Sequence, residues 1–204
     1  VGKSMLLNAF LGRERAIVSE IPGTTRDAID SLIEHDGQSV VLVDTAGIRR
    51  RGKVEPGIEH YGVLRAMRAV HRADVALLVI DASEGLTAQD AHIAGYVEEE
   101  AKGLVLVANK WDLMPKGEKT MRDFERRLRE ELQFLEYAPV VFVSAKLGTR
   151  LRKVLDTALH VREERRKRVP TGVLNELVRS IVASHVPARR GKQLKILYAT
   201  QAGV

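Results

Sequence analysis

Gly2-Lys3-Ser4 stands directly before residues 5–11, an apolar segment with helical spacing. These three residues match the end of the phosphate-binding pattern G-x-x-x-x-G-K-[ST], whose first glycine would stand ahead of Val1. Backbone N–H groups at such a helix start bind phosphate, Lys3 reaches the β- and γ-phosphates, and the Ser4 hydroxyl binds Mg²⁺. Three residues can match by chance, so this segment alone leaves the phosphate site undecided.

A second candidate segment, Asp44-Thr45-Ala46-Gly47, follows a run of Val and Leu at 40–43. A carboxylate at the carboxyl end of a strand can hold Mg²⁺, usually through water. The Gly47 N–H can approach a γ-phosphate because no Cβ stands in the way. The alternative is that Asp44 caps a helix N-terminus.

The third segment, Asn109-Lys110-Trp111-Asp112, follows an apolar run at 104–107. Asp112 can accept two hydrogen bonds from guanine, at N1–H and at the 2-amino group. Adenine has no 2-amino group and would leave the carboxylate unpaired, so the segment favours guanine. Asn109 is expected to brace the loop and to contact N7, and the Lys110 stem to lie along the base plane. The alternative is a surface turn rich in Asn and Asp.

The fourth segment, Ser144-Ala145-Lys146, follows the apolar run at 140–143, where a backbone N–H can meet guanine O6. Alone it is nearly uninformative. All four segments occur in this order, each at a predicted strand end or helix start. Ligands bind at the carboxyl edge of the strands in doubly wound sheets. The combination therefore indicates a guanine-nucleotide site.

Short runs of Val, Leu and Ile alternate with helical segments along the chain. This alternation is typical of a mainly parallel sheet covered by helices on both faces. We expect residues 30–35 to pair with 40–43 as a hairpin turned by Asp36-Gly37. The predicted buried strands are 40–43, 75–80, 104–107 and 140–143, and the predicted helices are 5–11, 57–72, 88–100, 120–134 and 150–167.

A domain boundary is predicted near Val169-Pro170, because proline cannot continue the preceding helix. Residues 1–168 then form an α/β domain, and 169–204 begin a second module. That module is expected to contain a helix at 173–182, a loop at 187–192 and a strand at 194–200.

The basic residues gather at the C-terminal end. Residues 160–204 hold ten Lys and Arg against three Asp and Glu, a net +7, whereas the whole chain has a net charge of +6. Charge gathered on one module is typical of a polyanion partner such as nucleic acid. The alternative, which fits residues 162–168 taken alone, is a solvated helix face.

Composition limits the function classes. The chain has 204 residues, 45% of them hydrophobic and 29% charged, which indicates a globular protein. It lacks an apolar run of about 18 residues and an apolar leader, so neither a membrane span nor a signal peptide is predicted. It contains no cysteine, which excludes disulfides and thiolate metal sites and is compatible with a cytoplasmic location.

The four segments resemble the G1, G3, G4 and G5 motifs of translation-factor-type GTPases, and residues 22–27 resemble their G2 switch segment. Other stretches resemble the Der (EngA) family of bacterial ribosome-assembly GTPases, which have two tandem G domains and a C-terminal KH-like domain. GIRRRGKV at 47–54 is similar to the second G domain, and VPTGVLNEL at 169–177 to the start of the KH-like domain. The remaining stretches are 61–68, 73–82, 85–90 and 109–113.

The resemblance implies a P-loop NTPase-type α/β fold, followed by a truncated α+β KH-like module. It implies catalytic roles for Lys3, Thr25 and Gly47, and Mg²⁺ held by Ser4, Thr25 and Asp44, with Thr24 the lesser candidate for the switch I hydroxyl. The nucleotide-binding residues it implies are Gly2, Lys3, Ser4, Asp44, Thr45, Ala46, Gly47, Asn109, Lys110, Asp112, Ser144, Ala145 and Lys146.

The resemblance also implies a GTP-hydrolysing switch in assembly of the large ribosomal subunit, with switch I near 19–27 and switch II near 47–60. Ile48 stands where Ras-like enzymes carry a water-positioning Gln. Relatives with this replacement often use K⁺, so K⁺ activation is a hypothesis here. The implied partners are GTP and GDP, the large ribosomal subunit with its rRNA, and another G domain.

Two alternatives stay open. The basic switch II residues Arg49, Arg50, Arg51 and Lys53 form either a solvated loop or a contact with rRNA or the neighbouring domain. The whole protein is either a GTPase switch or an RNA- or ribosome-binding module with little intrinsic hydrolysis. A KH fold normally carries a G-x-x-G loop, and residues 169–204 have none.

In the family that this chain resembles, a first strand precedes Gly-Lys-Ser and lies between the 40–43 and 75–80 strands. We therefore expect this sequence to be a fragment. Loss of a central strand leaves two ladders unpaired, so we also expect the isolated chain to bind GTP poorly or not at all.

Overall fold

The structure is a computed structural model, and it describes residues 1–13, 15–17, 30–43, 66–184, 188–189, 192–193 and 196–202. It forms two compact units, Val1–Arg162 (unit 1) and Glu163–Val204 (unit 2). The domain boundary expected after residue 168 stays a prediction. Several predicted site residues lie outside the described residues: Thr24, Thr25, the segment 44–47, Ile48 and the basic residues at 49–53.

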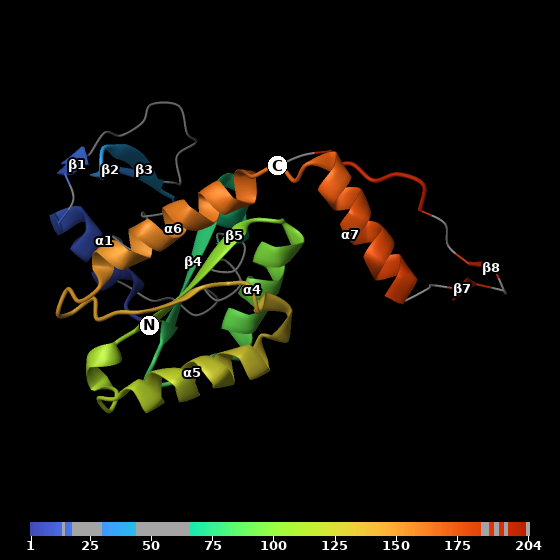
Figure 1. The fold of residues 1–204 in the computed structure, drawn as a ribbon. Coiled ribbons are helices and arrows are strands. Elements are labelled where there is room, and N and C mark those ends of the chain that lie inside the picture. The colour runs from blue at the N-terminus through green and yellow to red at the C-terminus, as the bar shows by residue number, and fades with distance from the viewer. Residues whose placement is uncertain are drawn as a thin grey trace. The chain divides into compact units, whose positions relative to one another are not determined.

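Unit 1 contains a parallel sheet in the order β4-β5-β6, of which Figure 1 labels β4 and β5. Its strands are β4 (Val75–Asp81), β5 (Gly103–Asn109) and β6 (Val140–Phe142). Every residue of β5 is buried, because it is the middle strand and both faces of the sheet are covered. The strands predicted from the three later apolar runs are confirmed.

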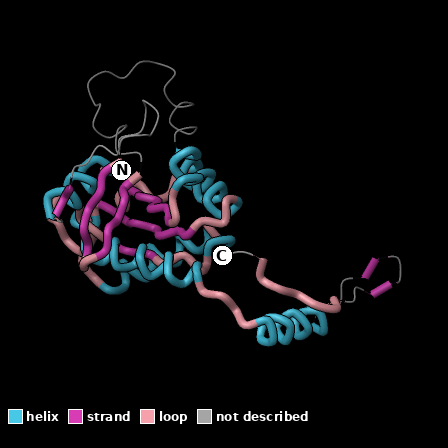
Figure 2. The backbone as a smooth tube through the Cα atoms, turned by 90° about the horizontal axis from the view of Figure 1, so that it is seen from above, coloured by secondary structure: helices cyan, strands magenta, loops and turns pink. Residues whose placement is uncertain are grey.

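Successive side chains of these strands enter two different cores. Val79 and Val107 pack under α1 (Lys3–Arg13) and α6 (Leu151–Arg166). Ile80 and Leu106 belong to the opposite cluster, with residues of the helix at 66–72, α4 (Ala88–Glu99) and α5 (Glu118–Glu131). Figure 2 shows helices on both sides of the strands. The predicted α/β fold with helices on both faces is thereby confirmed.

The helix ends differ somewhat from the prediction. The helix expected over 57–72 is described only from residue 66. α4 starts at a capping box, in which the Thr87 hydroxyl and the Asp90 backbone N are 3.2 Å apart. α5 ends at Glu131, short of the predicted 134, and a 3-10 helix (Gln133–Leu135) buries Leu135 instead.

A second sheet of unit 1 is antiparallel, in the order β1-β2-β3. Its strands are β1 (Arg15–Ile17), β2 (Ser31–His35) and β3 (Gln38–Leu42). Asp36 and Gly37 have φ of 49° and 75°, the positive values that a two-residue hairpin turn requires. The predicted hairpin is confirmed, but the strand expected at 40–43 is not buried as predicted, because Val41 is exposed.

The two sheets are not joined by hydrogen bonds between β3 and β4 within the described part of the chain. Val40 and Leu42 of β3 nevertheless pack against the same core cluster as Val75 and Leu77 of β4. The gap between β3 and β4 therefore lies where the family that the chain resembles has its first strand.

Unit 2 contains α7 (Thr171–Ser184) and the short strands β7 (Ala188–Arg189) and β8 (Lys192–Gln193). The loop predicted at 187–192 is wrong in part, because β7 and β8 pair there. The strand predicted at 194–200 is also wrong over its described residues, 196–200. The side chain of Asn175 pairs with the N–H and the carbonyl of Ala199, at 2.9 and 2.8 Å, in the manner of a neighbouring strand. None of the described helices could cross a membrane.

Candidate nucleotide-binding site

The start of α1 lies beside the carboxyl end of the parallel sheet. Gly2 has a φ of +84°, and its carbonyl accepts the N–H of Leu6 at 3.0 Å. A Cβ on Gly2 would lie 2.6 Å from Nδ2 of Asn109, so only glycine fits without movement. Lys3 is exposed and Ser4 half-buried in the first turn. Among the described residues Lys3 forms no ion pair, so its ammonium is available to an anion.

Asn109 connects three of the four segments. It is the last residue of β5 and is 2% exposed. Its Nδ2 donates to the carbonyl of Val1 at 2.9 Å, and its Oδ1 accepts the N–H of Ala145 at 3.0 Å. Asn109 therefore braces the loop as expected, by joining the start of α1 to the 144–146 loop through these two hydrogen bonds.

The residues after Asn109 are held by backbone and aromatic contacts. Lys110 has φ 61° and ψ 31°, and a 3-10 helix (Trp111–Leu113) follows it. The N–H of Trp111 donates to the carbonyl of Val143 at 3.0 Å. The indole packs on the rings of Phe124 and Phe142, with centroid distances of 5.4 and 4.4 Å. These contacts anchor the segment and leave the neighbouring Asp112 exposed.

The 144–146 loop closes on itself. Ser144 is buried, and its hydroxyl accepts the N–H of Leu147 at 3.1 Å. Ser144 and Thr149 also exchange backbone hydrogen bonds, at 3.3 and 3.0 Å. The N–H groups of Ser144 and Ala145 are thus both used, whereas that of Lys146 has no acceptor within the described residues.

These segments surround a hollow of about 170 Å³. It combines the apolar side chains of Met5 and Leu113 with charged groups, an arrangement suited to a flat base with polar edges. The lining residues are Gly2, Met5, Asn109, Lys110, Asp112, Leu113 and Lys146.

Asp81 belongs to this site, although none of the four candidate nucleotide-binding segments includes it. It ends β4, pairs in register with Asn109 and is 2% exposed. Its Oδ1 accepts the hydroxyl of Ser83 at 2.6 Å and the N–H of Ser83 at 3.1 Å, and its Oδ2 forms an ion pair with Lys110. A sequence signal existed, because Asp81 is an acid directly after a buried apolar run.

The pKa values of Asp81 and Lys110 reflect this pairing. Burial acts to raise the pKa of Asp81, but hydrogen bonds from Lys110 and Ser83 outweigh it and lower the pKa to about 2. The hydrogen bond to Asp81 raises the pKa of Lys110, against the effect of burial. Both groups are therefore charged at neutral pH.

Sequence comparison identifies the family. Residues 1–110 match the family described as 50S ribosome-binding GTPase. The chain belongs to this family. Residues 168–204 match the KH-domain-like segment described as C-terminal in EngA bacterial GTPase enzymes. The predicted resemblance is thereby confirmed.

Individual relatives agree with this assignment. GTPase Der of Desulfitobacterium hafniense (strain DSM 10664 / DCB-2) is 55% identical over 205 residues, covering 100% of this chain and 46% of the relative. GTPase Der of Chloroflexus aggregans is 53% identical over 203 residues, covering 98% and 45%. The chain therefore spans about half the length of the curated relatives it matches.

Solved structures of other GTPases share the fold. Era in complex with MgGDPNP and a segment of 16S ribosomal RNA has a TM-score of 0.59 and 29% identity, over 79% of this chain and 53% of that one. Era of Aquifex aeolicus bound to GDP·AlF₄⁻ has a TM-score of 0.58 and 28% identity, over 78% and 52%. The elongation factor SelB of Methanococcus maripaludis, at 21% identity and TM-score 0.56, covers 78% and 31% and shows the fold alone.

For this member of the 50S ribosome-binding GTPase family, the structure gathers most of the predicted site. The predicted residues on the hollow are Gly2, Asn109, Lys110, Asp112 and Lys146. Lys3 and Ser4 follow in the first turn of α1, and Ser144 and Ala145 lie buried beside Asn109. The predicted residues Thr25, Asp44, Thr45, Ala46 and Gly47 lie outside the described residues.

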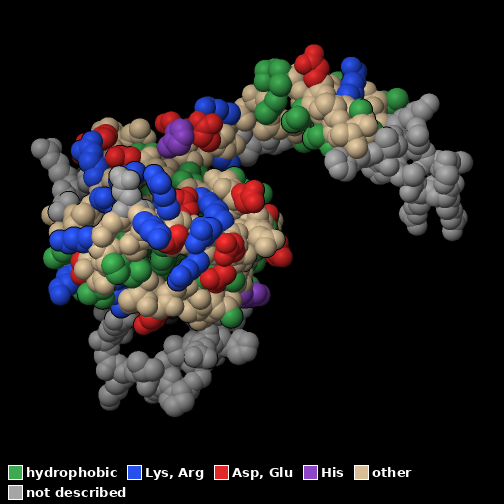
Figure 3. Space-filling view, turned by 60° about the horizontal axis from the view of Figure 1, so that its bottom comes forward, with side chains coloured by type: hydrophobic (Ala, Val, Ile, Leu, Met, Phe, Trp, Pro, Cys, Tyr) green, Lys and Arg blue, Asp and Glu red, His purple; other side chains and the backbone are tan. Residues whose placement is uncertain are grey.

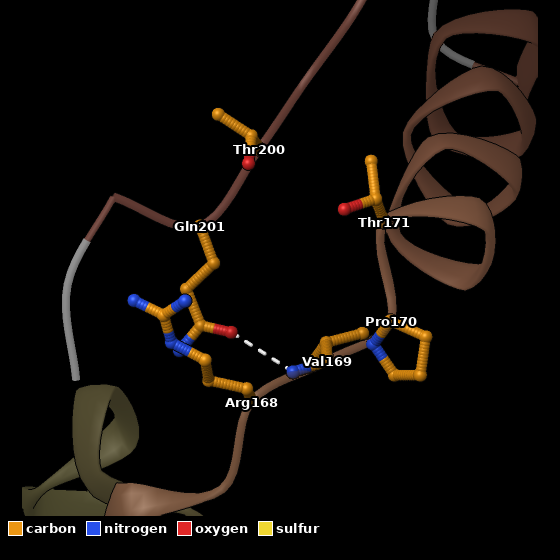
Figure 4. A pocket seen from close by; sticks show the side chains of 6 residues that line it. All are labelled: Arg168, Val169, Pro170, Thr171, Thr200 and Gln201. Atoms are coloured by element: carbon orange, nitrogen blue, oxygen red, sulfur yellow. Dashed lines mark hydrogen bonds between the residues drawn. The ribbon is translucent and has the colours of Figure 1, made fainter.

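Unit 2 has a hollow of its own, of about 250 Å³, at the start of α7 (Figure 4). The N–H of Val169 donates to Oε1 of Gln201 across it, at 2.9 Å. Its lining residues are Arg168, Val169, Pro170, Thr171, Thr200 and Gln201.

The surface charges of unit 1 contrast with the basic residues of unit 2. Figure 3 shows one face of the molecule, on which Lys and Arg side chains lie beside Asp and Glu. In α5, for example, Arg126 pairs with Asp123 and Arg129 with Glu125. The first pair is exposed and the second partly buried, and pairs near the surface contribute little to stability.

Proposed function

We propose that this chain forms a guanine-nucleotide site, and that the protein hydrolyses GTP as a switch in assembly of the large ribosomal subunit. One observation carries the proposal. The Asn109 side chain joins the start of α1 to the 144–146 loop, and Asp112 and Lys146 line the same hollow. A phosphate-binding helix start and a base-binding carboxylate thus belong to one site.

We assign recognition of the base to the N-K-W-D and S-A-K segments. Asp112 accepts N1–H and the 2-amino group of guanine, and the Lys110 stem lies along the ring plane. Because the N–H groups of Ser144 and Ala145 are already used, we assign the donor to guanine O6 to the Lys146 N–H. Asn109 contacts N7 in this proposal.

The phosphates belong at the start of α1. The Lys3 ammonium stabilises charge that develops on the γ-phosphate while water attacks it. The Ser4 hydroxyl in the first turn is a hard oxygen donor, which fits Mg²⁺, and Thr25 and Asp44 complete the proposed ligand set. Mg²⁺, when bound, neutralises part of the phosphate charge. The Gly47 N–H is proposed to contact the γ-phosphate, and the solved Era complexes with MgGDPNP and GDP·AlF₄⁻ support this use of the fold.

Asp112→Asn tests the base assignment. An amide can donate to the 2-keto group of xanthine, so the variant should lose GDP affinity and gain affinity for xanthosine diphosphate. Titration of both nucleotides into the protein at its full natural length measures the change. Asp123→Asn in α5 is the matched control, since Asp123 is partly exposed and pairs only locally with Arg126. Unchanged base preference in Asp112→Asn would refute the assignment.

K⁺ activation is a further proposal, motivated by Ile48, whose apolar side chain cannot orient the attacking water. We propose that K⁺ near the phosphates takes over part of this role. Turnover in KCl should exceed turnover in NaCl at equal ionic strength. Equal rates would remove K⁺ from the mechanism.

The second candidate function is RNA or ribosome binding with little intrinsic hydrolysis. It is favoured by the net +7 over 160–204 and by the position of Arg168 on the unit 2 hollow. RNA affinity should then fall steeply with salt, and Arg168→Ala should reduce the slope. Salt-independent binding would contradict this reading.

Phosphate release in the presence of large ribosomal subunits distinguishes the two candidate functions. A switch should release phosphate faster when large ribosomal subunits are added, whereas a binding module should bind them without faster release. We place the protein in the cytoplasm, with GTP, GDP, rRNA and a further G domain as partners. The 204-residue chain alone should bind nucleotide weakly, because β3 and β4 are not paired. Micromolar GDP affinity in calorimetry would show otherwise.

A further inference from the structure

We propose that Asp81 is a positioning residue for base specificity, which holds the Lys110 ammonium so that the Asp112 carboxylate stays free for the base edge. The inference rests on the proposed function and adds a residue that none of the four sequence motifs contains. Asp81 acts through Lys110 and has no contact with the nucleotide in this proposal.

The Asp81 carboxylate is held on both of its oxygens. Ser83 donates its hydroxyl and its N–H to Oδ1, and Lys110 pairs with Oδ2. The amino nitrogen of Val1 lies 3.6 Å from Oδ2. Because the side chain is 2% exposed, a charged carboxylate there needs a cation, and Lys110 is the side chain that supplies it.

The backbone around Asp81 keeps this geometry fixed. Asp81 faces Asn109 in the parallel register, and the N–H of Ala82 donates to the carbonyl of Asn109 at 2.9 Å. The N–H of Gly85 donates to the carbonyl of Asp81 at 2.8 Å. Asp81 is therefore built on the same strand ends that carry the base-binding segment.

Lys110 and Asp112 both line the hollow, two positions apart. A lysine stem is flexible, and its ammonium pairs with whichever carboxylate is within reach. If Asp81 lost its charge, the neighbouring anions acting on Lys110 would be Glu84 and Asp112. An ammonium on Asp112 would occupy the acceptor that distinguishes guanine from hypoxanthine, which has N1–H but no 2-amino group.

The test compares GDP with inosine diphosphate in the protein at its full natural length. Asp81→Asn should lower the ratio of the inosine diphosphate Kd to the GDP Kd by about tenfold or more, because one hydrogen bond to a charged group is lost from the discrimination. In the double variant Asp81→Asn with Lys110→Met, no ammonium is left to block Asp112. The Kd ratio of this double variant should therefore lie within about twofold of that of the single variant Lys110→Met. Asp74→Asn, at an exposed residue directly before the opposite end of β4, should leave the ratio unchanged.

The outcomes separate this inference from the proposed function. A wild-type protein that binds both nucleotides equally would refute the base assignment itself. If Asp81→Asn weakened the binding of both nucleotides alike and kept the wild-type Kd ratio, Asp81 would have a structural role and the inference would be overturned. A double variant whose Kd ratio does not return to the Lys110→Met value would also overturn it. If Asp81→Asn does not fold, Ser83→Ala frees Oδ1 and should lower the ratio in the same direction; an unchanged ratio there would also overturn it.

Discussion

Asn109→Ala should destabilise unit 1 out of proportion to the few atoms it removes. The side chain is 2% exposed and makes two hydrogen bonds, to the carbonyl of Val1 and from the N–H of Ala145. Ala145 is itself 5% exposed, so its N–H would be left buried without a partner. An orphaned buried donor costs about 1–3 kcal/mol, and the second hydrogen bond contributes about 1 kcal/mol. The expected loss of unfolding free energy is therefore about 2–4 kcal/mol.

The assay is urea unfolding of the chain, followed by the fluorescence of its single tryptophan. Trp111 lies two positions after Asn109 and packs on Phe124 and Phe142, so it reports on this part of unit 1. With a slope of about 2 kcal/mol per molar urea, the midpoint should fall by about 1–2 M. Asn109→Asp keeps the acceptor for Ala145 but buries an unpaired carboxylate against the Val1 carbonyl and beside Asp81, so its midpoint should fall at least as far as that of Asn109→Ala.

Asn8→Ala is the matched control, because Asn8 is exposed on α1 and alanine is a better helix former. Its midpoint should stay at or slightly above that of wild type. If Asn109→Ala lost less than about 0.5 kcal/mol, the side chain would not be bridging the two segments. The same result would remove the observation on which the proposed function rests.

Two further predictions concern the same site. Gly2→Ala should lower the free energy of unfolding by about 1–3 kcal/mol, because φ is +84° and the new Cβ would lie 2.6 Å from Nδ2 of Asn109. Gly12→Ala is the control and should not destabilise, because Gly12 lies in α1 with open space around it. Equal melting temperatures for the two variants would contradict the packing at Gly2. Because the pKa of Asp81 is lowered from 3.8 to about 2 in the folded chain, the stability from its ionisation is present above pH about 4 and is lost as the pH falls toward 2. Asp81→Asn should flatten this acid limb in unfolding experiments, whereas an unchanged limb would assign the loss to other carboxylates.

Most strands and helices of unit 1 could be predicted because each carries its own local signal, but β1 (Arg15–Ile17) was not predicted. The Val-Leu-Ile runs, the helical spacing and the Asp36-Gly37 turn depend on neighbouring residues only. The predicted strand at 194–200 failed for the opposite reason. The described part of that segment satisfies its backbone at Ala199 with the Asn175 side chain, a partner 24 positions away that no local pattern indicates.

The sequence by itself indicated that the motifs at 2–4, 109–112 and 144–146 share one edge of the sheet, because carboxyl ends of parallel strands meet there and each motif stands at such an end or at a helix start. It did not indicate the part that Asp81 takes. Only the tertiary structure decided how these motifs are held. Asn109 bridges Val1 and Ala145, and Asp81 pairs with Lys110, which directly follows the neighbouring strand β5. These are contacts between segments remote in the chain, set by strand register and burial. Pairwise geometry of that kind leaves no periodic or compositional trace in the order of the amino acids.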